Sequence, residues 1–209
     1  MDKYEIEGDL CDSYRSLVNH LLKKYGPAPC NYFTGEDCKK VDPRISRANE
    51  GLQCHHIDED KAIMLSDPEY AIKNPFKYQE ANRLVYCNLL EHLILHVLIT
   101  REPRKKSANP GELVGLGGAI NYLIPQINDY YSGRQFKQEY KRKQNEILKD
   151  SFDGYIYILT DLLADVIEQP YLRRYITKRK LSLCSDKTVN RAVYDRLATF
   201  GTRDYLLDE

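Results

Sequence analysis

The segment that most constrains the fold is residues 89–100, which read LLEHLILHVLIT and are apolar at almost every position. A run of this length and composition predicts a buried helix. His92 and His96 interrupt the run and are four residues apart. On a helix this spacing places both imidazoles on one face, one turn apart, which suits two ligands of one metal ion. Alone, such a pair is more often a packing feature than a site, so it needs support from elsewhere in the chain.

Two short segments that precede this helix are predicted to be strands. They are residues 51–57 (GLQCHHI) and 83–87 (RLVYC), and the second is rich in residues that favour strands. Successive side chains of a strand point to opposite sides, so the adjacent His55 and His56 are expected to face opposite ways. The order strand, long connection, strand, helix, with histidines at both ends, is typical of a ββα-metal site. In such a site one histidine of the first strand binds the metal and its neighbour acts as a base.

The rest of the chain is predicted to be mainly helical. Apolar residues indicate helices in residues 3–25, 113–131, 154–168 and 187–199. Residues 134–150 are expected to form a basic, solvated helix, and a short helix is expected near 67–71. Gly117 and Gly118 indicate close helix packing or a bend, because the Lys-Ser/Thr of a phosphate-binding loop does not follow them. We therefore expect a mostly helical α+β protein with a small ββα-metal unit embedded in a helical domain. Its regions are a supporting region (1–50), the ββα core (51–100) and a helical substrate-binding or oligomerisation region (101–209).

Composition limits the other possibilities. The chain has 209 residues, a formal net charge of zero, and no stretch that reaches the roughly 18–20 consecutive apolar residues of a membrane helix. Its acidic start lacks the apolar core of a signal peptide, so the cytoplasm is the expected compartment. The six cysteines form no C-x-x-C pair and are expected to be reduced. No H-E-x-x-H motif of a zinc protease is present.

Residues 54–57 (CHHI) together with 83–96 (RLVYCNLLEHLILH) resemble the motif of the HNH endonucleases, in the form found in phage and mobile-element enzymes and in nuclease colicins. The resemblance covers about residues 50–100. It implies one divalent metal ion held by His55, His92 and His96, with His56 as the general base. It also implies hydrolysis of DNA phosphodiester bonds that leaves 5′-phosphate and 3′-hydroxyl ends. Three imidazoles suit Zn²⁺, Ni²⁺ or Mn²⁺ better than Mg²⁺, which prefers oxygen ligands.

The chain departs from this motif at the position where the family has an asparagine. Counting back from His92, that position is Arg83, and Asn82 is its neighbour. Either Asn82 takes over the role after a slip of one residue, or Arg83 contacts phosphate as a fixed cation, or the site is impaired. We expect Asn82 or Arg83 to belong to the catalytic machinery. The connection between the strands is also longer than is usual in the family.

The acidic run Asp58, Glu59 and Asp60 directly follows the histidine pair. One of the three carboxylates is either a metal ligand or an orienting partner of a histidine. The competing interpretation is a solvated acidic turn.

The resemblance implies DNA as the partner, with RNA and a homodimer left open, whereas the net charge of zero does not by itself indicate a nucleic-acid binder. Residues 1–100 carry 12 Lys+Arg against 16 Asp+Glu, whereas residues 101–209 carry 19 against 15. The second half could therefore present a modest surface to phosphates, notably at 104–106, 141–143, 173–174 and 178–180, although solvated helix faces explain the same charges. The alternative function is a non-catalytic, metal-stabilised binding module for nucleic acid or protein, in which Cys54 or Asp58 supplies a fourth ligand and His56 is dispensable.

Overall fold

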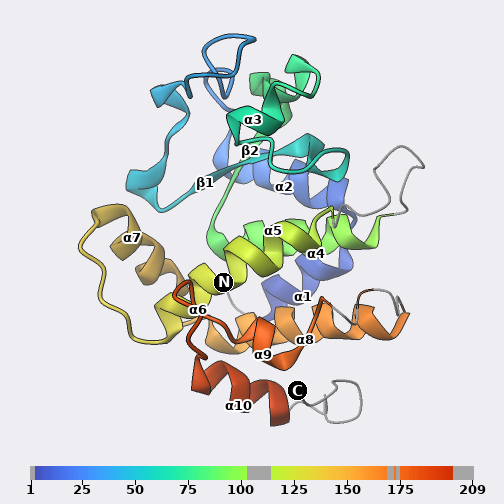
Figure 1. Ribbon diagram of the computed structural model, residues 1–209, viewed down its shortest axis with the longest axis vertical. Helices are drawn as coiled ribbons and strands as arrows, with labels where there is room; N and C mark the ends of the chain where they lie inside the picture. The colour runs from blue at the N-terminus through green and yellow to red at the C-terminus, as the bar shows by residue number, and fades with distance from the viewer. Residues whose placement is uncertain (1–2, 103–113, 169–171, 173–174, 200–209) are drawn as a thin grey trace.

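A computed structural model describes residues 3–102, 114–168, 172 and 175–199 of the chain. Within these ranges the protein is mostly helical, and it has one two-stranded antiparallel sheet (Figure 1). The strands are β1 (Gln53–His56) and β2 (Leu84–Cys87). The α-helices are α1 (Lys3–Cys11), α2 (Tyr14–Tyr25), α3 (Pro68–Ala71), α4 (Leu89–Arg101), α5 (Leu116–Gly118), α6 (Ile124–Tyr131), α7 (Glu139–Leu148), α8 (Phe152–Glu168), α9 (Lys178–Leu181) and α10 (Arg191–Thr199). The linker predicted at 101–111 falls largely outside the described residues.

The two strands pair in a register that sets the positions of both adjacent histidines. His55 lies opposite Val85, and His56 lies opposite Leu84. Between the strands the chain forms the 3-10 helices η3 (Ile57–Asp60), η4 (Phe76–Gln79) and η5 (Ala81–Arg83), with α3 between η3 and η4. The predicted strands and the short helix near 67–71 are thus confirmed. The long connection folds into a series of tight turns beside the sheet.

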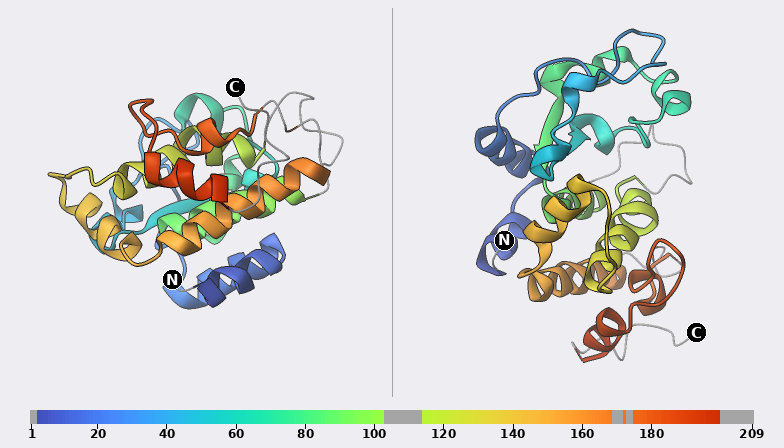
Figure 2. Two further views of the ribbon diagram at one scale, coloured as in Figure 1. Left: turned by 90° about the horizontal axis from the view of Figure 1, so that it is seen from below. Right: turned by 90° about the vertical axis from the view of Figure 1, so that its left-hand side faces the viewer.

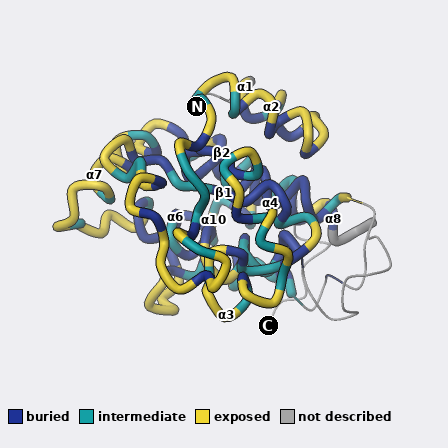
Figure 3. Tube along the Cα trace, turned by 90° about the horizontal axis from the view of Figure 1, so that it is seen from above, coloured by how far each residue is buried: buried dark blue, intermediate teal, exposed yellow. Residues whose placement is uncertain are grey.

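Helix α4 begins at a capping box directly after β2. The Asn88 side chain accepts hydrogen bonds from the backbone N–H groups of Leu90 and Glu91, and the Glu91 carboxylate accepts one from the backbone N–H of Asn88. This arrangement satisfies the free N–H groups of the first turn and fixes where the helix starts. Almost all of α4 is buried, as its apolar sequence predicts, and it runs through the interior of the molecule (Figure 3).

The N-terminal region forms two helices where the sequence predicted one continuous helix. Ser13 has an extended backbone, and its side chain accepts a hydrogen bond from the backbone N–H of Ser16, so it caps α2 and separates it from α1. Helix α2 ends at Gly26, whose φ of 78° lies in the region that favours glycine. Helix α2 packs on β2 and α4, and α1 lies beside α8 in both views of Figure 2.

The helices after residue 114 pack against the same core as the strands. One cluster of buried apolar side chains runs from Ile6 in α1 through α4 to Leu197 in α10. The π-helix η6 (Ala119–Leu123) continues α5 and packs on α4. The predicted close packing at Gly118 is confirmed, because a Cβ atom there would overlap the imidazole of His96. No described helix has the length and apolar character that crossing a bilayer requires.

Candidate metal centre

Three histidines and one carboxylate converge where β1, η3 and α4 meet. His55, Glu59, His92 and His96 each offer one ligand atom, and these four atoms lie within 4.8 Å of one another. His55 Nδ1 is 3.1 Å from His92 Nε2, and Glu59 Oε2 is 3.2 Å from His96 Nε2 and 3.6 Å from His55 Nδ1. The cluster could hold a metal ion.

Local structure explains how the four side chains meet. On β1 the alternation of side chains directs His55 towards α4, where His92 and His96 share one face as predicted. Their ring centroids are 5.0 Å apart. The turn of η3 then brings Glu59, four residues after His55, back to the same point. The fifth histidine of the chain, His20, is exposed on α2 and lies outside the cluster.

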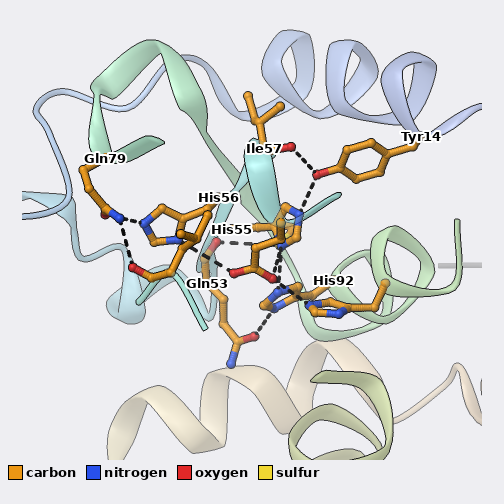
Figure 4. Close-up of polar contacts among 11 residues, drawn as sticks. Tyr14, Gln53, His55, His56, Ile57, Gln79 and His92 are labelled. Carbon is orange, nitrogen blue, oxygen red and sulfur yellow. Dashed lines mark hydrogen bonds and ion pairs between the residues drawn. The ribbon is translucent and has the colours of Figure 1, made fainter. Parts of the chain in front are cut away.

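In both α4 histidines, the ring nitrogen that points away from the cluster, Nδ1, is hydrogen-bonded to an oxygen that can act only as an acceptor. His92 Nδ1 donates to the side-chain oxygen of Gln53 at 2.7 Å (Figure 4), and His96 Nδ1 donates to the backbone carbonyl of Gly115 at 2.8 Å. Because each Nδ1 carries the ring proton, each Nε2 presents a lone pair to the centre. Partners of this kind orient metal-binding imidazoles and raise their basicity.

The outer nitrogen of His55 contacts a hydroxyl whose proton is already committed. The Tyr14 hydroxyl donates to the Ile57 carbonyl at 2.9 Å and lies 2.9 Å from His55 Nε2 (Figure 4). A hydroxyl has a single proton, so its oxygen accepts the hydrogen bond from His55 Nε2. The Nδ1 of His55 therefore also presents a lone pair to the centre.

These tautomers suit the cluster to a cation. Two lone pairs, on His55 Nδ1 and His92 Nε2, face each other at 3.1 Å without a proton between them, and a carboxylate adds a negative charge. A cation converts this repulsion into attraction. Three nitrogens and one oxygen suit a tetrahedral Zn²⁺, and also Ni²⁺ or Mn²⁺. The residues present fit the predicted divalent ion.

Burial keeps the donor set in the protonation states that a cation needs. Burial lowers the pKa of His55 to about 3 and holds the pKa of His92 well below its ordinary value, so both imidazoles are neutral near pH 7. Burial by itself raises the pKa of the Glu59 carboxyl, but the surrounding histidines, His55 first, outweigh it and hold that pKa below the ordinary range. Glu59 is therefore ionised.

His56 lies on the opposite side of β1, and its position differs from that of the ligands. His56 Nε2 is 2.8 Å from the side-chain oxygen of Gln79, whose amide nitrogen donates to the Leu65 carbonyl at 3.1 Å (Figure 4). The second bond fixes the orientation of the Gln79 amide, so His56 Nε2 carries the proton and Nδ1 holds a lone pair. This Nδ1 is buried without a hydrogen-bond partner, 3.8 Å from Glu59 Oε1. Burial lowers the pKa of His56.

Arg83 and Asn82 lie outside the ligand set. Arg83 forms a bidentate ion pair with Asp58, with Nε–Oδ2 and Nη2–Oδ1 distances of 2.6 and 2.5 Å, and Lys61 pairs with the same carboxylate. Asn82 is exposed in η5. Because Asp58 is committed to these cations, it is not the fourth ligand.

The sequence pointed to one carboxylate of the acidic run and did not identify Glu59. The spacing of four residues from His55, closed by a turn of η3, is the signal that distinguishes it. Cys54, the other candidate for a fourth ligand, belongs to the opposite side of β1, and burial raises its pKa to about 12. Comparison with protein-family models, curated proteins and solved structures found no match for the chain.

Proposed function

We propose that the protein is a metal-dependent nuclease of the HNH type, with His55, His92, His96 and Glu59 around the ion and His56 as the general base. The observation that supports this most is the lone pair on His56 Nδ1. It is held in one tautomer by Gln79, lies beside the cluster, and has no partner among the described residues. Buried polar atoms are almost always satisfied, and an exception next to a candidate metal centre is expected of a group that reacts.

The chain's own groups suit hydrolysis of a phosphodiester. A bound divalent ion would supply Lewis acidity towards a phosphate oxygen and neutralise charge that develops in the transition state. Neutral His56 accepts a proton from water at Nδ1, and Gln79 Oε1 stabilises the imidazolium that forms through its bond to Nε2–H. The low pKa of His56 keeps it in the basic form near pH 7.

The reaction requires access from the Glu59 side of the cluster. His55 and His56 are fully buried, whereas the Glu59 side chain is 15% exposed and His92 is half-buried. A bound ion would be held by the three histidines and by Glu59, the member of the cluster whose side chain is most open to an approaching phosphate. Glu59 would have to give way for a substrate phosphate to reach the ion.

A structural metal site is the second candidate function, and the presence of Glu59 as a fourth potential ligand favours it. Four protein ligands around one ion, mostly buried, are typical of sites that hold a fold together. In that case Glu59 stays on the ion and His56 is a packed core residue. The two functions differ in what His56 is needed for.

Nicking of supercoiled plasmid tests the proposal, with Mn²⁺, Ni²⁺, Zn²⁺ and Mg²⁺ supplied in turn and EDTA as the blank. We expect metal-dependent cleavage that falls by about 10²–10⁴-fold in His56→Ala, the range of general-base contributions. His20→Ala is the matched control, because it removes an exposed imidazole from α2. A single-stranded RNA of the same sequence in a parallel series distinguishes DNA from RNA as substrate. Stoichiometric metal binding without cleavage of either nucleic acid, or equal cleavage by wild type and His56→Ala, would contradict the proposal.

A further inference from the structure

A second polar feature lies beside the candidate metal centre. It is a hollow of about 350 Å³ formed by residues of the turns η3, η4 and η5 and their immediate neighbours. Its lining consists of charged side chains and one aromatic ring: Asp58, Lys61, Lys77, Tyr78, Glu80 and Arg83. Three cations against two carboxylates leave it a net positive charge.

The floor of the hollow is a buried carboxylate that holds two cations in place. The Asp58 side chain is 1% exposed, whereas those of Arg83 and Lys61, which both bind it, are 29% and 34% exposed. Arg83 binds Asp58 through Nε and one N–H of Nη2, so three of its five N–H groups remain for another partner. The ion pairs with Asp58 fix the orientation of both cations beforehand, and the Asp60 carboxylate lies 4.0 Å from the Lys61 ammonium group as a second, more distant partner.

The third cation of the hollow, Lys77, lies over the ring of Tyr78. The ammonium groups of Lys61 and Lys77 lie 5.7 and 5.8 Å from the centroid of the Tyr78 ring. Lys77 is exposed, and the only described contact of its ammonium group is this ring. Both ammonium groups are thus held near one ring, at a distance where the attraction is weak enough to yield to an anion.

We propose that this hollow binds a phosphate group of the nucleic-acid strand, next to the phosphate that is cleaved. The proposal rests on the nuclease function proposed above and names how its substrate is held. Asp58 and Glu59 are consecutive in η3, so a phosphate bound by Arg83 and Lys61 lies on the same turn as the ligand that must withdraw. A planar guanidinium with an adjacent ammonium is a suitable partner for phosphate oxygens. In this proposal the position of Arg83 is explained by its contact with a substrate phosphate.

The salt dependence of DNA binding tests this inference. A labelled DNA duplex is titrated onto metal-loaded protein that carries His56→Gln to prevent cleavage, at several salt concentrations. Each lost phosphate contact lowers the slope of log K against log salt by about 1. We expect such a drop, with weaker binding, in Lys61→Gln and in Lys77→Gln. The matched control is Lys73→Gln, an exposed lysine that lies over Tyr70 and does not line the hollow. Arg83→Gln should show the largest loss.

The lysine variants decide the outcome even if Arg83→Gln folds poorly. Lys61→Gln leaves Arg83 on Asp58, and Lys77→Gln removes no ion pair among the described contacts. Slopes equal to that of Lys73→Gln in both lysine variants, or no binding of the duplex by the parent protein, would overturn the inference.

Cleavage assays separate this failure from failure of the proposed function. Efficient plasmid cleavage by Lys61→Gln and Lys77→Gln, with KM unchanged, would contradict the proposed phosphate site and still support the nuclease function. If the parent protein cleaves no nucleic acid but the salt slope of DNA binding still falls in both lysine variants, the hollow is supported as a phosphate site and the nuclease function is contradicted.

Discussion

The two sides of β1 carry histidines at consecutive positions, His55 and His56, and surround them with different partners. On one side, His55 has its outer nitrogen on Tyr14 and its inner nitrogen in a cluster with His92, His96 and Glu59. On the other side, His56 has its outer nitrogen on Gln79, and its inner nitrogen has no partner. Both rings are fully buried. The difference between them is therefore one of partners and not of exposure.

This comparison shows how a fold can give one residue type two different surroundings. In both cases a distant side chain fixes the tautomer, so a lone pair is available on the side facing Glu59. Three further donor atoms converge on the lone pair of His55, which makes it a candidate ligand. The lone pair of His56 faces only a carboxylate at 3.8 Å and remains free to accept a proton. The predictions below test this division, from the largest expected effect to the smallest.

Removal of a ligand should have the largest effect, and removal of His56 should not share it. His92→Ala is expected to lose stoichiometric binding of Zn²⁺ or Mn²⁺, whereas His56→Ala should keep it. If free metal in the assay is about 1,000-fold above Kd, loss of the ion costs about 4 kcal/mol of stability, or on the order of 10 °C in Tm. Isothermal titration and thermal unfolding, each with and without EDTA, measure both. Equal metal binding by His92→Ala and His56→Ala would contradict the proposal that the ligands lie on only one side of β1.

A smaller loss is expected when the support of His55 is removed and the ligand is kept. Tyr14→Phe deletes the oxygen that accepts the proton of His55 Nε2 and leaves the ring packing. Loss of such an outer partner typically weakens metal affinity by about 10–100-fold. Competition with a chelator of known affinity provides the measurement, and Tyr122→Phe, at an exposed tyrosine, is the matched control. Unchanged affinity would mean that the tautomer of His55 is set by the ion alone.

The smallest effect is expected from crowding the last ligand. Gly118→Ala places a methyl group against the His96 ring, with Nδ1 2.7 Å from the new carbon atom. The ring or the helix must move, which we expect to cost about 1–3 kcal/mol of stability and to weaken metal binding. Chemical denaturation with and without metal measures the two parts. Gly8→Ala, in α1 with open space around it, should leave metal binding unchanged. A Gly118→Ala protein with wild-type stability and affinity would show that His96 needs no fixed position.

The sequence predicted the elements and three of the four residues of the cluster because their signals are local. A strand directs His55 and His56 to opposite sides whatever surrounds them, and a helix brings His92 and His96 to one face. The apolar run 89–100 identified the buried helix that carries the second pair. Glu59 was within reach of the same reasoning, because only a helical turn separates it from His55.

The supporting residues could not be predicted, because nothing local marks them. Tyr14 reaches His55 across 41 positions, Gln79 reaches His56 across 23, and Gln53 reaches His92 across 39. These contacts depend on how the helices and turns pack together. The break at Ser13 was missed for a related reason, since its extended backbone interrupts an apolar pattern that continues through it. The role of Arg83 likewise depends on Asp58, which a motif comparison does not place.

The hydrogen bond from His96 to the Gly115 carbonyl has a consequence for the time at which the centre matures. A ribosome releases the chain from its N-terminus, so all four ligands emerge before the residue that orients the last of them. A nascent chain that ends at His96 holds three imidazoles and a carboxylate but no acceptor for His96 Nδ1 and no glycine at position 118 against the ring. Any metal captured in the final geometry would therefore have to wait until residues 115–118 have also emerged.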